Sequence, residues 1–262
     1  MSIKAMDDRW NTLAQELKGA RTSGATMAAL TAADIPADTP TAYTVQDQLI
    51  SLRGETVRAW KIGASSAAAQ GGMGLSEPFS GPMFDDVLFQ SPAKFAADRF
   101  SVHLFEPEIA IILASDLRGG DDVTADEAAE AIGSSHAAIE LIDFRSEGGR
   151  ALGALGMITD HGANGGFVMG DPLPADPDAY WSVDLDVRIN GASVATRTPP
   201  PPETHPAELL AWLARHLWAR GRTLRAGDVI TTGTQAGIIP YKAGDKVEVV
   251  FASTAIAAFE CA

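Results

Sequence analysis

The spacing of apolar residues along the chain changes near residue 55, from a helical period to short strand-like segments. Residues 7–19 and residues 43–53, YTVQDQLISLR, each place their apolar side chains on one helical stripe. Gly54 follows the second segment and is a typical helix stop. We therefore predict a helical portion over residues 1–55 and a β-rich domain over residues 56–262.

The β-rich part contains strand patterns and one well-marked helix start. Residues 56–62 are typical of a strand, and residues 182–189 alternate between apolar and polar side chains. Asn190-Gly191 then predicts a two-residue hairpin turn. The segment 124–127 begins with Thr and ends with Glu, which is the pattern of a helix capping box. We expect the helix that it starts to end near Gly133.

Two glutamates stand directly before the most apolar strand in the chain. Glu106 and Glu108 precede the run Ile109–Leu113, and on an extended segment residues i and i+2 share a face. Pro107 has no N–H for a sheet ladder, which suits a strand end or a bulge. Such close carboxylates repel unless a cation lies between them, and oxygen ligands favour Mg²⁺ or Mn²⁺. The alternative is a solvated acidic strand end.

Lys61 lies near the end of the predicted strand 56–62, among apolar neighbours. Its ammonium could extend to solvent, or it could be partly buried with a depressed pKa and move protons near neutral pH. Small residues follow it and permit close approach of a ligand to the backbone. Ser65, in that small-residue segment, is therefore a candidate for substrate binding.

A second acidic segment, AAIELIDFR, carries Glu140 and Asp143. Residues three apart cannot share a face of a strand. One of the two is therefore a site candidate, and the other faces solvent or forms an ion pair, with Arg145 as a possible partner. Periodicity alone does not decide between them.

Two glycine-rich segments complete the candidate chemistry. Asp160, His161 and Asn164 form the densest polar cluster in the chain, although glycine-flanked Asp and Asn also commonly shape turns. Thr234 belongs to TTGTQAG, whose N–H and O–H groups could hold a carboxylate or could form an ordinary loop.

Composition narrows the classes of function. The 262 residues include 20 basic and 34 acidic side chains, which gives a net charge of −14 and disfavours nucleic acid and anionic membranes as partners. No apolar run is long enough to span a bilayer. The first residues, MSIKAMDDRW, lack the pattern of a signal peptide, and the single cysteine, Cys261, suits a reducing compartment. We expect a cytoplasmic protein.

Eight segments in a fixed order resemble one known family. They are AYTVQ, AWKIGASS, GPMFDD, FEPEIAIIL, AAIELIDFR, TDHGANGGFVMG, HPAELLAWLA and GDVITTGT. This set resembles the 2-keto-4-pentenoate hydratases and 4-oxalocrotonate decarboxylases of the fumarylacetoacetate hydrolase superfamily. The resemblance implies an α+β fold, in which a mixed β-sheet roll of the fumarylacetoacetate hydrolase C-terminal-domain type follows an N-terminal helical portion. It also implies a homo-oligomer.

The same resemblance assigns roles to individual residues. It implies a Mg²⁺ or Mn²⁺ ion held by Glu106, Glu108 and Glu140, with Lys61 as the active-site lysine. A small anionic 2-oxo acid would chelate that ion through its carboxylate and oxo oxygens. The metal and the ammonium would then make the site locally positive in an acidic protein.

The chain departs from the family pattern at two places. Where hydratases usually carry an aspartate in an S-E-P-D loop, this sequence has Phe79, which puts hydration in doubt but not metal binding. The family's D-N-A segment reads Asp160-His161-Gly162 here. His161 could supply acid–base chemistry near neutral pH or could be a turn residue. We keep Asp160 and His161 as candidate catalytic residues, and Asn164 and Thr234, together with Ser65, as candidates for substrate binding.

Four functions follow from these observations. The first is a metal-dependent hydratase of 2-hydroxy-alka-2,4-dienoates in aromatic catabolism. The second is a decarboxylase of a 2-oxo-enedioate, which needs no positioned water. A carbon–carbon bond hydrolase ranks lower because that chemistry usually uses an N-terminal histidine, and no histidine precedes His103. The last is a non-catalytic protein that binds a metal or an oxo acid.

Overall fold

The computed structural model describes residues 8–174, 176–181, 183–197 and 202–262. Predictions for residues 1–7 and for residue 182 lie outside these ranges. Within them, no helix combines the length and the apolar character that a membrane crossing requires.

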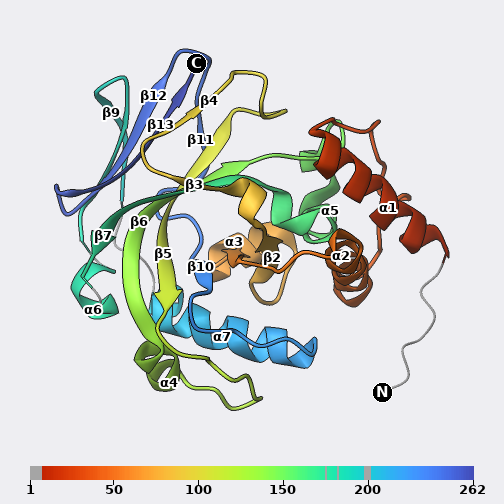
Figure 1. Cartoon of the computed structure of the whole chain (residues 1–262), viewed down its shortest axis with the longest axis horizontal. Helices are drawn as coiled ribbons and strands as arrows, with labels where there is room; N and C mark the ends of the chain where they lie inside the picture. The colour runs from red at the N-terminus through yellow and green to blue at the C-terminus, as the bar shows by residue number, and fades with distance from the viewer. Residues whose placement is uncertain (1–7, 175, 182, 198–201) are drawn as a thin grey trace.

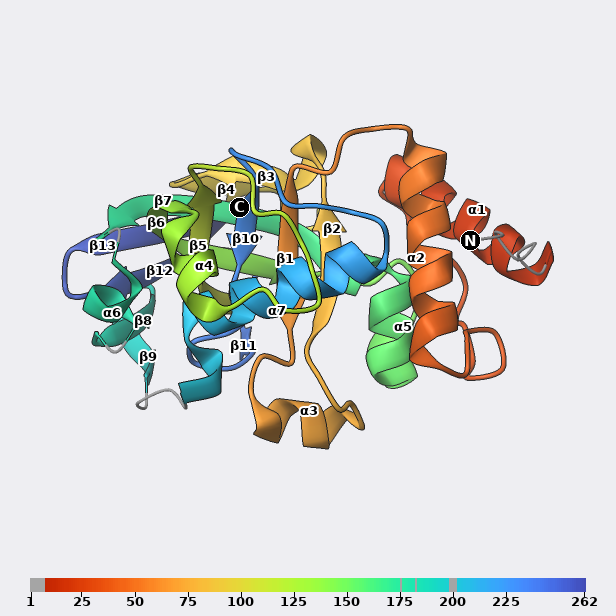
Figure 2. The ribbon, with the colours of Figure 1, turned by 90° about the horizontal axis from the view of Figure 1, so that it is seen from below.

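Two N-terminal helices form one end of the molecule. Helix α1 spans Asp8–Ser23 and α2 spans Thr39–Arg53, and their apolar stripes pack on each other. The side chain of Asp38 caps α2 by accepting a hydrogen bond from the Thr41 N–H, and Gly54 ends it with a φ of 65°. Figures 1 and 2 both show α1 and α2 beside α5, which spans Gly153–Thr159, and far from the C-terminal strands.

The larger sheet carries the strands that matter for the site. Among the described residues its strand order is β2-β1-β10-β5-β6-β7-β3, with β11 paired to β5. Most neighbours are antiparallel, but β1–β10 and β3–β7 are parallel, so the sheet is mixed. The strands are β1 (Ala59–Gly63), β2 (Phe79–Met83), β3 (Leu88–Gln90), β5 (Leu104–Leu113), β6 (Ile132–Ile142), β7 (Asn164–Leu173), β10 (Val229–Thr231) and β11 (Ile239–Pro240).

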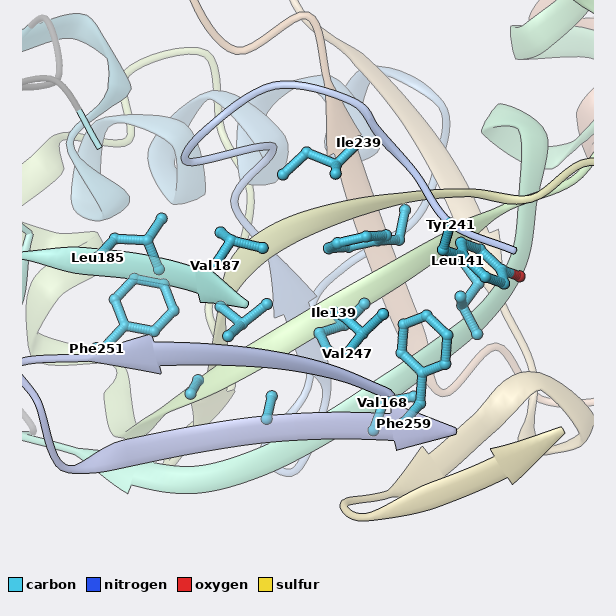
Figure 3. Packing of buried hydrophobic residues seen from close by; sticks show 14 of the residues in the cluster. Ile139, Leu141, Val168, Leu185, Val187, Ile239, Tyr241, Val247, Phe251 and Phe259 are labelled. Carbon is cyan, nitrogen blue, oxygen red and sulfur yellow. The ribbon is translucent and has the colours of Figure 1, made fainter. Parts of the chain in front are cut away.

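A smaller sheet packs against one part of the larger one. Its order is β4-β13-β12-β8-β9, formed by β4 (Ala93–Phe95), β8 (Leu185–Ile189), β9 (Ala192–Thr196), β12 (Lys246–Phe251) and β13 (Ala255–Cys261). The main apolar core lies between the two sheets (Figure 3). Ile139 and Leu141 on β6 face Val247 on β12 and Phe259 on β13 in this core. Alternation of apolar side chains along each strand creates this buried layer.

Helices cover another part of the larger sheet. Helix α7, Pro206–Ala219, buries the side chains of Leu209, Leu210, Leu213 and Leu217 against β1, β5 and β10 together with α4, Ala125–Glu130. The remaining helices are short, α3 at Ala67–Met73 and α6 at Pro177–Tyr180.

Several local predictions are confirmed, and one helix boundary is corrected. The Thr124 capping box is present, and Asn190-Gly191 connects β8 to β9 with both residues at positive φ. The helix after Thr124 ends at Glu130 instead of near Gly133, because Ile132 and Gly133 already belong to β6. The predicted α+β class, with N-terminal helices and a mixed sheet, is confirmed.

Candidate metal centre and substrate cavity

Three carboxylates converge where β5 and β6 pair. The antiparallel register places Glu106 directly opposite Glu140, and Glu108 lies two residues along β5 on the same face. One oxygen from each of these side chains lies within 4.8 Å of the other two. Glu108 and Glu140 are fully buried, while Glu106 is partly exposed to a cavity.

The electrostatics of this cluster suit a bound cation. Burial raises the pKa of Glu106 to about 7, partly countered by the Lys61 ammonium, with Glu140 raising it further. Burial, together with repulsion from Glu140 and Glu106, raises the pKa of Glu108 well above its usual value. Oε1 of Glu108 has no hydrogen-bond partner among the described residues. A buried, oxygen-only donor set with an unused oxygen fits Mg²⁺ or Mn²⁺.

Lys61 lies on β1, which pairs in parallel with β10, and its side chain extends to the carboxylate cluster. Its Nζ lies 2.9 Å from Oε2 of Glu140 and donates a hydrogen bond to the carbonyl of Gly162 at 3.1 Å. The side chain is buried, so the alternative of an ammonium that extends to solvent does not hold. The expected depressed pKa is also wrong: burial lowers the pKa of Lys61, but Glu140, Glu106 and Glu108 together raise it above its usual value.

Two neighbouring groups hold the carboxylates in place. The N–H of Gly233, just after β10, donates to Oε2 of Glu108 at 3.0 Å. Nδ2 of Asn164, at the start of β7, donates to Oε1 of Glu140 at 3.0 Å. Asn164 therefore contacts a carboxylate of the cluster and does not line the cavity, although it was predicted to bind substrate directly. Hydrogen bonds of this kind fix the rotamer of a metal ligand.

A large cavity opens beside the carboxylates. Its volume is about 940 Å³, enough for a small organic acid with room to spare. Ser65 and Thr234, which were predicted to bind substrate, both line it. Other residues in its wall include Lys61, Phe79, Glu106 and Arg150.

Asp160 and His161 do not line this cavity. Both side chains are buried behind its wall, and burial with three nearby arginines lowers the pKa of His161 well below its usual value. The lowered pKa, and the position of the ring against Phe84 outside the cavity wall, do not support the alternative in which His161 supplies acid–base chemistry near neutral pH. Asp160 forms an ion pair with Arg21 of α1, and His161 precedes the Gly162 carbonyl that Lys61 contacts.

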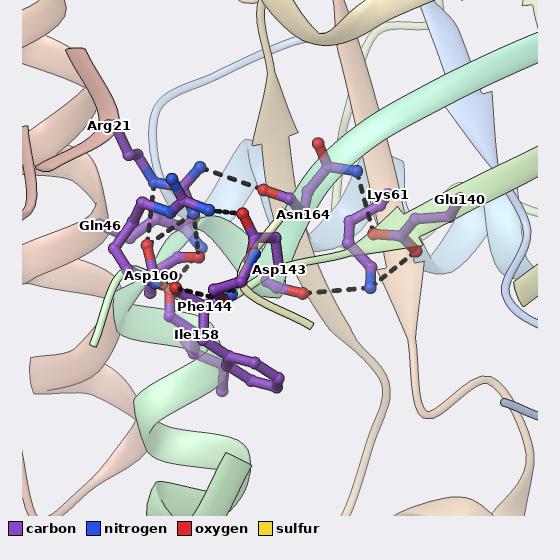
Figure 4. A network of polar contacts seen from close by, with 12 residues as sticks. Arg21, Gln46, Lys61, Glu140, Asp143, Phe144, Ile158, Asp160 and Asn164 are labelled. Atoms are coloured by element: carbon purple, nitrogen blue, oxygen red, sulfur yellow. Dashed lines mark hydrogen bonds and ion pairs between the residues drawn. The ribbon is translucent and has the colours of Figure 1, made fainter. Parts of the chain in front are cut away.

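The partner of Asp160 is an arginine that sequence reasoning did not identify. Arg21, near the end of α1, donates to Oδ1 of Asp160 through Nε at 2.9 Å and through Nη2 at 2.6 Å. Its Nη1 donates to the carbonyl of Asn164 at 3.1 Å. Figure 4 shows Arg21 beside Asp160 and Asn164, with Asn164 and Lys61 both directed at Glu140. Arg21 lies on a helix 139 residues before Asp160, so no local sequence pattern indicates this contact.

The structure also separates the two acidic residues of the segment 137–145, Glu140 and Asp143. Glu140 joins the carboxylate cluster, whereas Asp143 lies beyond the end of β6 and forms an ion pair with Arg145. Asp143 also accepts a hydrogen bond from the N–H of Ser101 at 2.8 Å.

Fold and site together define a class: a mixed-sheet roll with a buried carboxylate triad and a lysine beside a cavity. The model of the fumarylacetoacetate (FAA) hydrolase C-terminal family matches residues 65–260, and the chain belongs to this family. The resemblance found in the sequence is thereby confirmed.

Two hydratases are similar over most of this chain. The 2-oxo-hept-4-ene-1,7-dioate hydratase of Escherichia coli is 34% identical over 218 residues, which are 79% of this chain and 81% of that protein. The 2-hydroxyhexa-2,4-dienoate hydratase of Comamonas testosteroni is 30% identical over 250 residues, 91% and 92% of the two chains. Among solved structures, 4-oxalocrotonate decarboxylase from Pseudomonas putida G7, complexed with magnesium and adipate, matches with a TM-score of 0.84 and 21% identity. That match covers 97% of this chain and 98% of the decarboxylase, and it shows a shared fold.

Proposed function

We propose that this protein is a metal-dependent hydratase that adds water to a 2-hydroxy-alka-2,4-dienoate in aromatic catabolism. The observation that carries the proposal is the convergence of Glu106, Glu108 and Glu140 beside Lys61 at the edge of the cavity. The 2-oxo-hept-4-ene-1,7-dioate hydratase at 34% identity and the 2-hydroxyhexa-2,4-dienoate hydratase at 30% identity support it.

Glu106, Glu108 and Glu140 would hold Mg²⁺ or Mn²⁺. When bound, such an ion supplies Lewis-acid stabilisation of the negative charge that develops on the oxygens of a 2-oxo acid. A ligand in the cavity would approach the ion from the side of Glu106, which is partly exposed there, while Glu108 and Glu140 are fully buried.

The chain's own residues would bind the substrate and control its protons. Lys61 keeps its ammonium next to Glu140, where Nζ can donate a hydrogen bond to an oxygen of the substrate's acid head. Ser65 and Thr234 line the same cavity and offer hydroxyl groups to that head. Hydration first moves the proton of the 2-hydroxyl group to C5 of the diene, which gives a 2-oxo-3-enoate. Water then adds its hydroxyl to C4 and its proton to C3.

A decarboxylase of a 2-oxo-enedioate is the second candidate, and Phe79 is the observation that favours it. Its ring is buried in the cavity wall, and the ring centroid lies 5.5 Å from Nζ of Lys61. The ring also fills the space beside Gly63, where an added Cβ would lie 2.2 Å from Cζ of Phe79. An aromatic ring cannot hold a water molecule as an aspartate would. Decarboxylation needs no such water.

The test is a direct assay of the purified protein with Mg²⁺ or Mn²⁺. We expect 2-hydroxypenta-2,4-dienoate to be consumed with loss of its ultraviolet absorbance, and we expect a chelator to stop the reaction. Release of CO₂ from 2-oxohex-3-enedioate without hydration would transfer the assignment to the decarboxylase. Metal-dependent binding of oxalate without turnover of either compound would identify a non-catalytic protein. A homo-oligomer and a cytoplasmic location stay predictions.

A further inference from the structure

The cavity wall has a defined order along β5 and β6. Leu104 lies two residues from Glu106, and Ile142 lies two residues from Glu140, so each shares a strand face with its carboxylate. The register pairs Leu104 with Ile142, just as it pairs the two glutamates, and both apolar side chains line the cavity. Two residues of strand span about 7 Å. Leu104 and Ile142 therefore form an apolar part of the wall next to the carboxylates, at a distance that a short hydrocarbon chain spans.

Arg150 lies beyond this apolar part of the wall. Phe144 comes two residues after Ile142 and also lines the cavity. The 3-10 helix Gly149–Leu152 packs directly on it, since a Cβ at Gly149 would lie 2.8 Å from Cβ of Phe144. Arg150 is the next residue, and its exposed side chain reaches the cavity wall. Moving outward from the carboxylates, the wall thus changes from acidic to apolar to cationic.

The charges in the wall leave one cation, away from the carboxylate cluster, for the distal end of a ligand. Of the described residues that line the cavity, Lys61 and Arg150 are the basic ones. Lys61 lies at the carboxylate cluster, contacts Glu140 and the carbonyl of Gly162, and there serves the acid head of the substrate. Arg150 has no ion-pair or hydrogen-bond partner within the described part of the chain. The acidic Glu203, elsewhere in the wall and 3.4 Å from the N–H of Ala67, would repel a second anion on its side.

We propose that Arg150 binds the distal carboxylate of a dicarboxylic substrate, so that the preferred substrate is a 2-oxo-enedioate or a 2-hydroxy-dienedioate. The inference rests on the proposed function, because it needs the acid head of the substrate at Glu106, Glu108 and Glu140. The carbon chain then lies along Leu104, Ile142 and Phe144. A guanidinium presents parallel N–H donors that match the two oxygens of a carboxylate.

The experiment compares two ligands that differ only in the distal group, 2-oxoadipate and 2-oxohexanoate. Their affinities are measured by calorimetry with Mg²⁺ present, for the unmodified protein, for Arg150→Met and for Arg188→Met. Arg188 is a matched control because it is partly exposed, lies on β8 outside the cavity, and pairs with Asp186. Thermal melting of each variant verifies that it is folded.

We expect the unmodified protein and Arg188→Met to bind 2-oxoadipate at least about tenfold more tightly than 2-oxohexanoate, as a charged hydrogen-bonded pair provides. In Arg150→Met the two affinities should become equal within about twofold. Equal affinities in the unmodified protein, or a preference that survives Arg150→Met, would overturn the assignment. Failure of the proposed function is a separate result, since it would appear as no turnover of any dienoate or enedioate while the affinity ratio can still be measured.

Discussion

Replacement of Arg21 by methionine tests how much the contact between the N-terminal helix and Asp160 stabilises the fold. The guanidinium of Arg21 is buried and donates two hydrogen bonds to Oδ1 of Asp160, one to the Asp160 carbonyl and one to the Asn164 carbonyl. Methionine keeps the apolar stem but leaves the Asp160 carboxylate buried without its countercharge. Removal of one partner from a buried ion pair costs about 3–5 kcal/mol of folding free energy.

Urea unfolding of metal-free protein measures this loss. The double variant Arg21→Met/Asp160→Asn removes the stranded charge and should recover at least about 1 kcal/mol relative to Arg21→Met. Lys18→Met, an exposed change on the same helix, should stay within about 0.5 kcal/mol of the unmodified protein. A loss below about 1 kcal/mol for Arg21→Met, or a double variant less stable than the single one, would refute the reasoning.

Three further predictions concern the metal centre and the response to acid. Glu108→Gln should weaken Mn²⁺ binding by more than about 100-fold in calorimetry, whereas Glu248→Gln on β12 should leave it unchanged. Asn164→Leu removes the hydrogen bond to a metal ligand and should weaken Mn²⁺ binding about 10- to 100-fold in a folded protein. Burial, followed by the charge of Arg220, lowers the pKa of His216 from 6.5 to about 3, so the folded state holds fewer protons than the unfolded state between these values. Stability should therefore fall as the pH drops from 6.5 toward 3, and urea unfolding of His216→Leu should show a shallower fall.

Short-range chemistry was the most predictable part of this molecule. The Thr124 capping box and the Asn190-Gly191 turn depend on backbone groups within four residues, and both occur as expected. The end of α2 at Gly54 likewise follows from one residue that accepts a positive φ. That Glu106 and Glu108 share a strand face could be predicted from the two-residue repeat of a strand alone.

Long-range contacts were the least predictable part. The direction of the pKa shift of Lys61 depends on Glu140. Glu140 lies on β6, which is not adjacent to β1 in the sheet, so the sequence does not indicate that the two side chains meet. Burial alone favours a lower pKa, and only the number of nearby carboxylates reverses the direction. The ion pair of Asp160 could not be predicted because its partner, Arg21, lies 139 residues away.

The register of β5 against β6 explains why two acidic segments become one site. Pairing of Glu106 with Glu140 puts both carboxylates on one face, and a slip of one residue would turn either strand's carboxylates to the other face. The same slip would bury Glu140 in the apolar layer that contains Ile139 and Leu141, at the cost of an unpaired buried charge. The core between the two sheets therefore selects the register that assembles the carboxylates. The geometry of the metal centre follows from apolar packing on the opposite face of the same strands.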